Sequence, residues 1–111
     1  MPPPLDRGKV AAGFADAVNM DPDELEAWLE TPESLSVGRR KGGATESVGH
    51  ASGRRIVRIL RTPKPEMDDE GYAHMRKVVG FVRRHRAQEP ANMVTSRWRY
   101  SLMNWGHDPL K

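Results

Sequence analysis

Apolar residues recur at helical spacing along most of the chain, and no segment alternates convincingly between apolar and polar positions. Val10, Phe14 and Val18 share one face of a helix predicted over residues 9–18. Together with the three later helices and the capped helix in the next paragraph, this pattern indicates an all-α fold, a single small bundle of about five helices with no sheet. The same spacing predicts three later helices, over residues 51–62, 69–87 and 94–105.

The stretch NMDPDELEAWLETP carries the clearest helix signal in the chain. Asp21 is a suitable N-cap, Pro22 suits the first helical position, and Glu24 completes an Asp-x-x-Glu capping box. The apolar stripe of this helix ends with Leu29, and Pro32 prevents the helix from continuing. We therefore expect a structural helix here rather than a catalytic carboxylate pair.

Residues 33–49 show no sustained period and contain four glycines, which predicts irregular structure. The tetrapeptide SVGR at Ser36 returns as SVGH at Ser47, and we interpret the two copies as similar turns. The basic, glycine-rich run between them is predicted to form a mobile loop. The helix that follows is expected to begin at His50 or Ser52.

The chain of 111 residues fits one domain, which we place at residues 9–111 after a flexible lead-in at residues 1–8. It contains no cysteine, which excludes disulfides, Cys-based zinc sites and thiol nucleophiles. Its apolar runs are too short to cross a membrane, and its proline-rich start lacks the apolar core of a signal peptide. The simplest interpretation is a cytoplasmic protein without membrane association.

Charge is distributed unevenly along the chain. Residues 1–35 contain eight acidic and two basic residues, whereas residues 36–111 contain seven acidic and sixteen basic ones. The two balances, −6 and +9, sum to the net charge of +3. A basic body favours an anionic partner. The alternative is that the two halves neutralise each other within one fold.

The stretch ESVGHASGRRIVRIL, residues 46–60, joins a segment of small residues to two arginines at the predicted helix start. A helix start offers unpaired backbone N–H groups and the positive end of the helix dipole. Arg54 and Arg55 would be unfavourable there unless an anion were bound. The alternative is a capped structural turn whose arginines pair with Glu46 or with the acidic N-terminal helices. The residues of the predicted anion-binding turn are Gly49, Ser52 and Gly53.

Arginine and lysine residues recur on two predicted helices and on the basic loop. If these side chains form one continuous face, they would neutralise the phosphates of a nucleic acid. The alternative is an ordinary solvated face. No recognition helix can be identified, so the pattern favours phosphate contacts over base readout. The predicted nucleic-acid-binding residues are Arg39, Arg40, Lys41, Arg54, Arg55, Arg58, Arg61, Arg76, Lys77, Arg83 and Arg84.

The sequence RWRY interleaves aromatic and basic residues, a pattern that can stack the bases of single-stranded RNA or DNA. Trp98 shares a helical face with Leu102 and Trp105, so we expect it in the core. Tyr100 is the better candidate for a surface contact.

The histidines and serines show no catalytic or metal-binding spacing. None of the four histidines forms an i, i+4 pair or an HExxH pattern, and no serine lies in a nucleophile elbow. The glycine-rich stretch also lacks the Gly-Lys-Ser/Thr ending of a Walker motif. We therefore predict no catalytic residue, no metal, no cofactor and no enzymatic activity.

Four long segments, NMDPDELEAWLETPESLSVG, ESVGHASGRRIVRIL, YAHMRKVVGFVRRHRAQ and SRWRYSLMNWGHDPLK, occur in this order between Phe14 and Lys111. They resemble a small bacterial family known as domain of unknown function 3140. Some members of that family carry the label DNA-binding protein, so the resemblance implies nucleic-acid binding. It supplies no catalytic or ligand residues, and the lead-in MPPPLDRGK looks peculiar to this chain.

These observations predict a non-enzymatic protein that binds DNA through its phosphate backbone with little sequence preference. The alternative is a protein–protein interaction module, in which the acidic first helices of one copy meet the basic body of another copy or of a partner. RNA in place of DNA is a third interpretation, supported by the aromatic residues of RWRY.

Overall fold

The computed structural model describes residues 6–92, 94 and 96–111, and this part of the chain contains helices and no strand. The predicted all-α fold without a sheet is therefore confirmed. None of these helices is long and apolar enough to cross a membrane. The elements are α1 (Arg7–Ala17), α2 (Pro22–Leu29), α3 (Pro32–Ser36), α4 (Val48–Leu60), the 3₁₀ turn η1 (Lys64–Glu66), α5 (Asp69–Arg86) and α6 (Arg97–Asn104).

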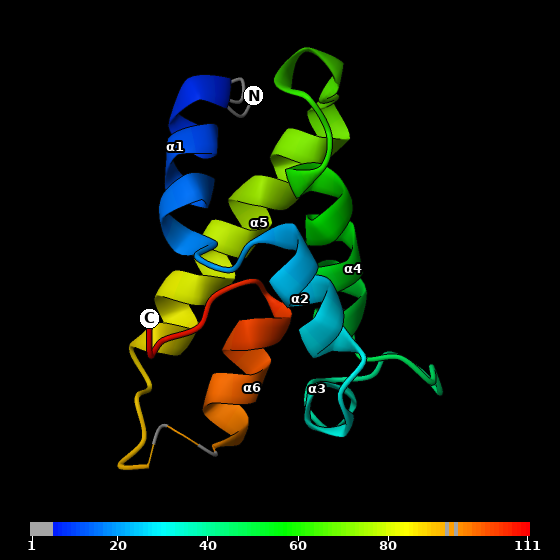
Figure 1. The fold of residues 1–111 in the computed structure, drawn as a ribbon, viewed down its shortest axis with the longest axis vertical. Coiled ribbons are helices and arrows are strands. Elements are labelled where there is room, and N and C mark those ends of the chain that lie inside the picture. Colours follow the sequence, from blue (N-terminus) through cyan, green and yellow to red (C-terminus); the bar gives the residue numbers. More distant parts are fainter. Residues whose placement is uncertain (1–5, 93, 95) are drawn as a thin grey trace.

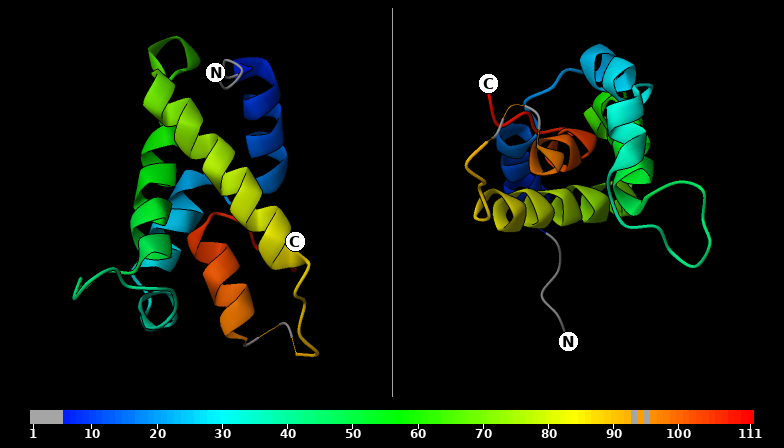
Figure 2. Two further views of the ribbon diagram at one scale, coloured as in Figure 1. Left: turned by 180° about the vertical axis from the view of Figure 1, so that it is seen from behind. Right: turned by 90° about the horizontal axis from the view of Figure 1, so that it is seen from below.

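The longest helix, α5, crosses the molecule diagonally, with α1 packed along one of its sides (Figures 1 and 2). The second main pair is α2 against α4. Helix α6 contacts α2, α3, α4 and α5, so it joins the two pairs. The loop between α3 and α4 extends away from the bundle beside the start of α4 (Figure 2).

The core is built from the apolar stripes that the sequence pattern predicts. Leu25, Ile56, Val78 and Leu102 come from four different helices, and each is 0% exposed. Complete burial of one such side chain contributes about 1.5–3 kcal/mol. Trp98 and Trp105 lie in the same cluster, which confirms the predicted core face of the last helix.

Two helix ends match their sequence signals. At α2 the Glu24 N–H donates to Asp21 Oδ1 at 2.8 Å, and the Asp21 N–H donates to Glu24 Oε1 at 3.3 Å. This reciprocal pair is the predicted capping box. After α6, Gly106 has φ of +81°, a left-handed conformation that glycine adopts without steric cost.

Several predicted boundaries are wrong. The last helix, expected over residues 94–105, begins at Arg97 because Ser96 caps it. Helix α4 begins at Val48 because Ser47 caps it, accepting the His50 N–H at 3.0 Å. The segment predicted as irregular also contains α3. Pro32 ends α2 as expected, but it also occupies the first position of α3, which Thr31 caps by accepting the Ser34 N–H at 3.2 Å.

The predicted lead-in at residues 1–8 is too long. Asp6 caps α1 by accepting the Lys9 N–H at 3.0 Å, so Arg7 and Gly8 are helical. Residues 1–5 lie outside the described residues.

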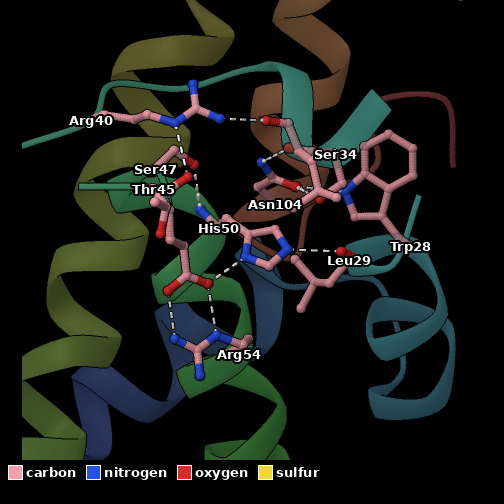
Figure 3. Close-up of polar contacts among 11 residues, drawn as sticks. Trp28, Leu29, Ser34, Arg40, Thr45, Ser47, His50, Arg54 and Asn104 are labelled. Carbon is pink, nitrogen blue, oxygen red and sulfur yellow. Dashed lines mark hydrogen bonds and ion pairs between the residues drawn. The ribbon is translucent and has the colours of Figure 1, made fainter. Parts of the chain in front are cut away.

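Asn104 forms a buried polar centre that connects α6 to α2 and α3 (Figure 3). Its Oδ1 accepts the Trp28 indole N–H at 2.8 Å and the Ser34 hydroxyl at 2.5 Å. Its Nδ2 donates to the Ser34 carbonyl at 3.0 Å. Since buried polar groups are costly unless they are paired, this network specifies how α6 docks.

Candidate functional site

Arg54 of α4 is held in an internal ion pair rather than presented to solvent as a lone charge (Figure 3). Its Nε and Nη2 donate to the two carboxylate oxygens of Glu46 at 2.7 and 2.5 Å. His50 Nδ1 contacts the same carboxylate at 2.5 Å, and His50 Nε2 donates to the Leu29 carbonyl at 2.7 Å. The hydrogen bond from Arg54 lowers the pKa of Glu46 to about 2. The cluster therefore ties the loop to α4 and α4 to α2.

Two more arginines, Arg55 within α4 and Arg61 at its C-cap, face carboxylates. Arg61 donates to Asp23 at 2.7 Å and to Glu26 at 2.9 Å, both on α2. Arg55 is held more loosely, with its guanidinium 4.0 Å from the Glu70 carboxylate. The alternative interpretation from the sequence, pairing with Glu46 or with the acidic N-terminal helices, is thus confirmed for Arg54 but not for Arg55. The pairing of Arg61 with α2 agrees with the alternative that the two halves of the chain neutralise each other.

The basic loop is closed at its neck. The Val48 N–H donates to the Arg39 carbonyl at 2.7 Å. Arg40 donates to the carbonyls of Thr45 and Leu35, both at 3.0 Å, so its side chain staples the loop (Figure 3). The two SVG copies are therefore not similar turns, because the second one opens α4.

The predicted anion-binding turn is wrong. Gly49, Ser52 and Gly53 lie inside α4 and are buried. A Cβ on Gly49 would lie 2.9 Å from Trp105 Nε1, and one on Gly53 would lie 2.5 Å from the Asn104 carbonyl oxygen. The small residues let α6 approach α4 closely. The backbone N–H groups of Ser52 and Gly53 lie within the helix, and Gly49, in the first turn, packs against Trp105.

The other predicted cations have side chains without a hydrogen bond or ion pair to the described residues. They occupy the loop, one position of α4 and the outer surface of α5. Within residues 6–92, 94 and 96–111 these are Arg39, Lys41, Arg58, Arg76, Lys77, Arg83 and Arg84.

Three hollows adjoin one another on α5, and Lys77 lines all of them. Two are shallow, and we call them together the basic groove. The third is more enclosed, has a volume of about 450 Å³, and is called the inner pocket. The basic groove is lined by Arg55, Glu70, Ala73, His74, Arg76, Lys77, Gly80 and Arg84.

The inner pocket lies between the basic loop, the start of α4, α5 and α6. Its apolar wall contains Phe81 and Trp105, whose rings stack with centroids 4.3 Å apart. No carboxylate belongs to its described lining. Its cations are Arg39, Lys41, Lys77 and Arg84, and its polar residues include His85, Ser101 and Asn104.

Two polar atoms of the pocket lining lack partners. His85 Nε2 is buried without a hydrogen bond. The Trp105 indole N–H also makes none within the described part of the chain. Burial lowers the pKa of His85, so its ring stays neutral at pH 7. The pocket thus combines aromatic surface, excess positive charge and unused hydrogen-bonding capacity.

Residues 13–103 match the sequence model of a protein family described as protein of unknown function (DUF3140). The chain belongs to this family. No curated protein and no solved structure matches it. The segment matched by DUF3140 contains all of α2 to α5, and therefore the whole basic groove.

One histidine of this DUF3140 chain pairs with a serine, but the serine is not exposed. Ser52 Oγ lies 2.8 Å from His74 Nε2, and Ser52 is only 4% exposed. Burial lowers the pKa of His74 to about 4, and the charges of Arg55 and Lys77 act in the same direction. We interpret the pair as a contact between α4 and α5. Among the described residues, no group of three or more His, Asp or Glu side chains is placed to hold a metal ion.

Sequence reasoning missed the aromatic part of the inner pocket. The helical pattern predicts Trp105 for the core and gives Phe81 no role, and nothing in it marks a side chain that lines a cavity. A usable signal was present on α5, where Lys77, Phe81 and His85 follow one another at i, i+4 spacing. This stripe runs along the helix through the inner pocket.

Proposed function

We propose that the protein binds DNA through the phosphate backbone, without enzymatic activity and with little sequence preference. One observation carries the proposal: six cations line three adjoining hollows, and Glu70 is the sole carboxylate among the described residues that line them. Backbone neutralisation by clustered cations is the usual source of nucleic-acid affinity. The cations are Arg39, Lys41, Arg55, Arg76, Lys77 and Arg84.

The shape of the basic groove supports this proposal. Ala73 and Gly80 lie between the cations of α5 and have little or no side chain. A Cβ on Gly80 would lie 3.0 Å from Arg84 Nη1, so the glycine leaves room for the guanidinium beside the helix. A strand can therefore bring its phosphates close to α5.

The contact set is smaller than the sequence predicts. Arg54 and Arg61 neutralise carboxylates of this chain, and Arg40 closes the loop. Arg58 and Arg83 carry charge outside the three hollows. Arg55 stays in the set because a 4.0 Å contact between exposed side chains is weak.

The alternatives have less support. The acidic section is partly used within the chain, since Arg61 pairs with Asp23 and Glu26. This removes part of the motive for a protein–protein module. For RNA, Tyr100 is half-buried, and its ring packs on Trp28 with centroids 5.5 Å apart. We place the protein in the bacterial cytoplasm, where DNA is accessible and where a chain without disulfides is expected.

The test is fluorescence anisotropy with a labelled duplex of mixed sequence at several salt concentrations. Affinity should fall log-linearly with salt, and the Lys77→Gln, Arg84→Gln double variant should reduce the slope by about 2, because two phosphate contacts are lost. The matched control is Arg58→Gln, Arg83→Gln, which removes the same charge outside the hollows.

Circular dichroism serves as the check that both double variants fold. The proposal fails if the wild type does not bind the duplex at low salt. It also fails if the two double variants lose affinity equally, because net charge rather than the groove would then be responsible.

A further inference from the structure

The inner pocket is built differently from the basic groove beside it. The groove is open and polar, whereas the pocket places an aromatic wall behind four cations. Four like charges around a cavity of about 450 Å³ with no carboxylate in its described lining repel one another. An anionic group at the mouth relieves this repulsion, and a planar apolar group inside fills the cavity.

The aromatic wall belongs to a column of near-parallel rings that joins α5 and α6. Phe81 lies between Trp105 and His85, at centroid distances of 4.3 and 5.0 Å. The column extends to His74 on one side and to Trp98 on the other, and neighbouring rings are inclined by 19° or less. The Trp98 indole N–H donates to the His85 carbonyl at 2.6 Å, which ties the Trp98 end of the column to α5.

The polar atoms of the wall add a second requirement. Trp105 Nε1 can only donate a hydrogen bond, and the buried Nε2 of neutral His85 can donate or accept one. A hydrocarbon would leave both groups unsatisfied. A heterocycle with acceptor and donor edges satisfies them, and a volume of this size accommodates one such ring system.

From these features we infer that the inner pocket binds a single unpaired nucleotide of a DNA strand, with its base against the edges of the Phe81 and Trp105 rings and its flanking phosphates on Lys77 and Arg84. The last two cations line both the pocket and the groove, so one strand can contact the two sites together. This inference rests on the proposed function. It adds a preference: DNA with an unstacked base should bind more tightly than a perfect duplex.

The experiment compares three labelled probes by anisotropy: a duplex, the same duplex with one unpaired nucleotide, and its single strand. Burial of the base in the pocket, with hydrogen bonds to Trp105 and His85, should make the wild type bind the two probes with unpaired bases about tenfold more tightly than the duplex. Ser101→Leu puts bulk into the pocket without changing its charge, and Ser101 makes no side-chain hydrogen bond to the described residues. This variant should lose the preference and keep the duplex affinity, and the matched Ser101→Ala control should keep both.

A second variant, Phe81→Leu, removes the ring while keeping an apolar side chain, and it too should bind all three probes equally. If the wild type binds the three probes equally, the inference is overturned while the proposed function stands. If no probe binds, the inference and the proposed function are both overturned. Competition with free deoxyadenosine monophosphate completes the design, because binding of this nucleotide without binding of any DNA probe would overturn the assignment to a strand.

Discussion

Helices α4 and α5 carry similar runs of arginine at helical spacing, yet the two runs have different roles. On α4 and at its C-cap, Arg54 and Arg61 form ion pairs with carboxylates of the same chain. On α5, Arg76 and Arg84 reach no acidic partner among the described residues and instead line the groove. The same local pattern therefore holds one helix in place and leaves the other one charged.

The difference comes from what packs beside each helix. Helix α4 lies against the acid-rich α2, and the Arg61–Asp23 contact joins residues that are 38 positions apart. The outer face of α5 has Glu70 near one end and cations along the rest. An arginine stripe indicates a binding surface only when the fold brings no carboxylate to it.

The largest effect is expected from a matched pair of glycine substitutions. Gly53→Ala should destabilise the protein by about 2–4 kcal/mol, because its Cβ would lie 2.5 Å from the Asn104 carbonyl oxygen. Gly80→Ala should be neutral or stabilising by up to about 1 kcal/mol, because the nearest atom is the flexible end of Arg84 and alanine favours helix. Urea denaturation followed by circular dichroism measures both, and equal losses would contradict the contrast.

Acid should affect the two helices in different pH ranges. The pKa of His74, at the contact between α4 and α5, is lowered from 6.5 to about 4, so the unfolded state binds more protons between these values. The free energy of unfolding should therefore fall by about 1–2 kcal/mol as pH drops from 6.5 to 4. The ion pair between Glu46 and Arg54 should lose its contribution to stability between pH 4.5 and about 2, because the pKa of Glu46 is also lowered in the folded state.

Urea midpoints measured at a series of pH values test this order of events. His74→Gln should reduce the pH dependence in the upper range, to which His85 and His107 also contribute because burial lowers their pKa values, and leave the lower range. Glu46→Gln should do the reverse. A stability that stays constant from pH 6.5 to 4 in the wild type would refute the assignment of His74 to a neutral, buried contact.

The smallest effects come from single arginine substitutions, and they separate the two helices by function. Arg54→Gln should cost about 1 kcal/mol of stability and leave duplex affinity unchanged, because its charge is already paired. Arg84→Gln should change stability by less than about 0.5 kcal/mol and weaken duplex binding. Urea denaturation measures the stability and anisotropy measures the duplex affinity of the same samples. If both variants changed these two properties in the same way, the two arginines would not differ in role.

Local signals predicted the fold well and the site only in part. The capping box at Asp21 and the core stripe of Trp98, Leu102 and Trp105 depend on neighbours in sequence, so they could be recognised there. The role of Gly49 and Gly53 could not be recognised from the sequence, since glycine is as suitable for a turn as for close helix packing. Only the approach of α6 decides between them.

The basic surface could also be predicted only in part. The sequence identifies the cations, including Lys77 and Arg84, but it cannot identify which of them meet a carboxylate after folding. It also gives no sign that Phe81, which packs against the core, lines a cavity. Charge partners and cavities are properties of distant segments brought together.

The buried hydrogen bonds of Asn104 have a consequence for biosynthesis. They connect α6 to Trp28 and Ser34, which leave the ribosome much earlier in translation. Until α6 has emerged, the earlier helices expose the apolar faces that Trp98 and Leu102 later cover. A nascent chain that has reached only α5 therefore presents a surface for chaperones, and folding of this bundle waits for the synthesis of its last helix.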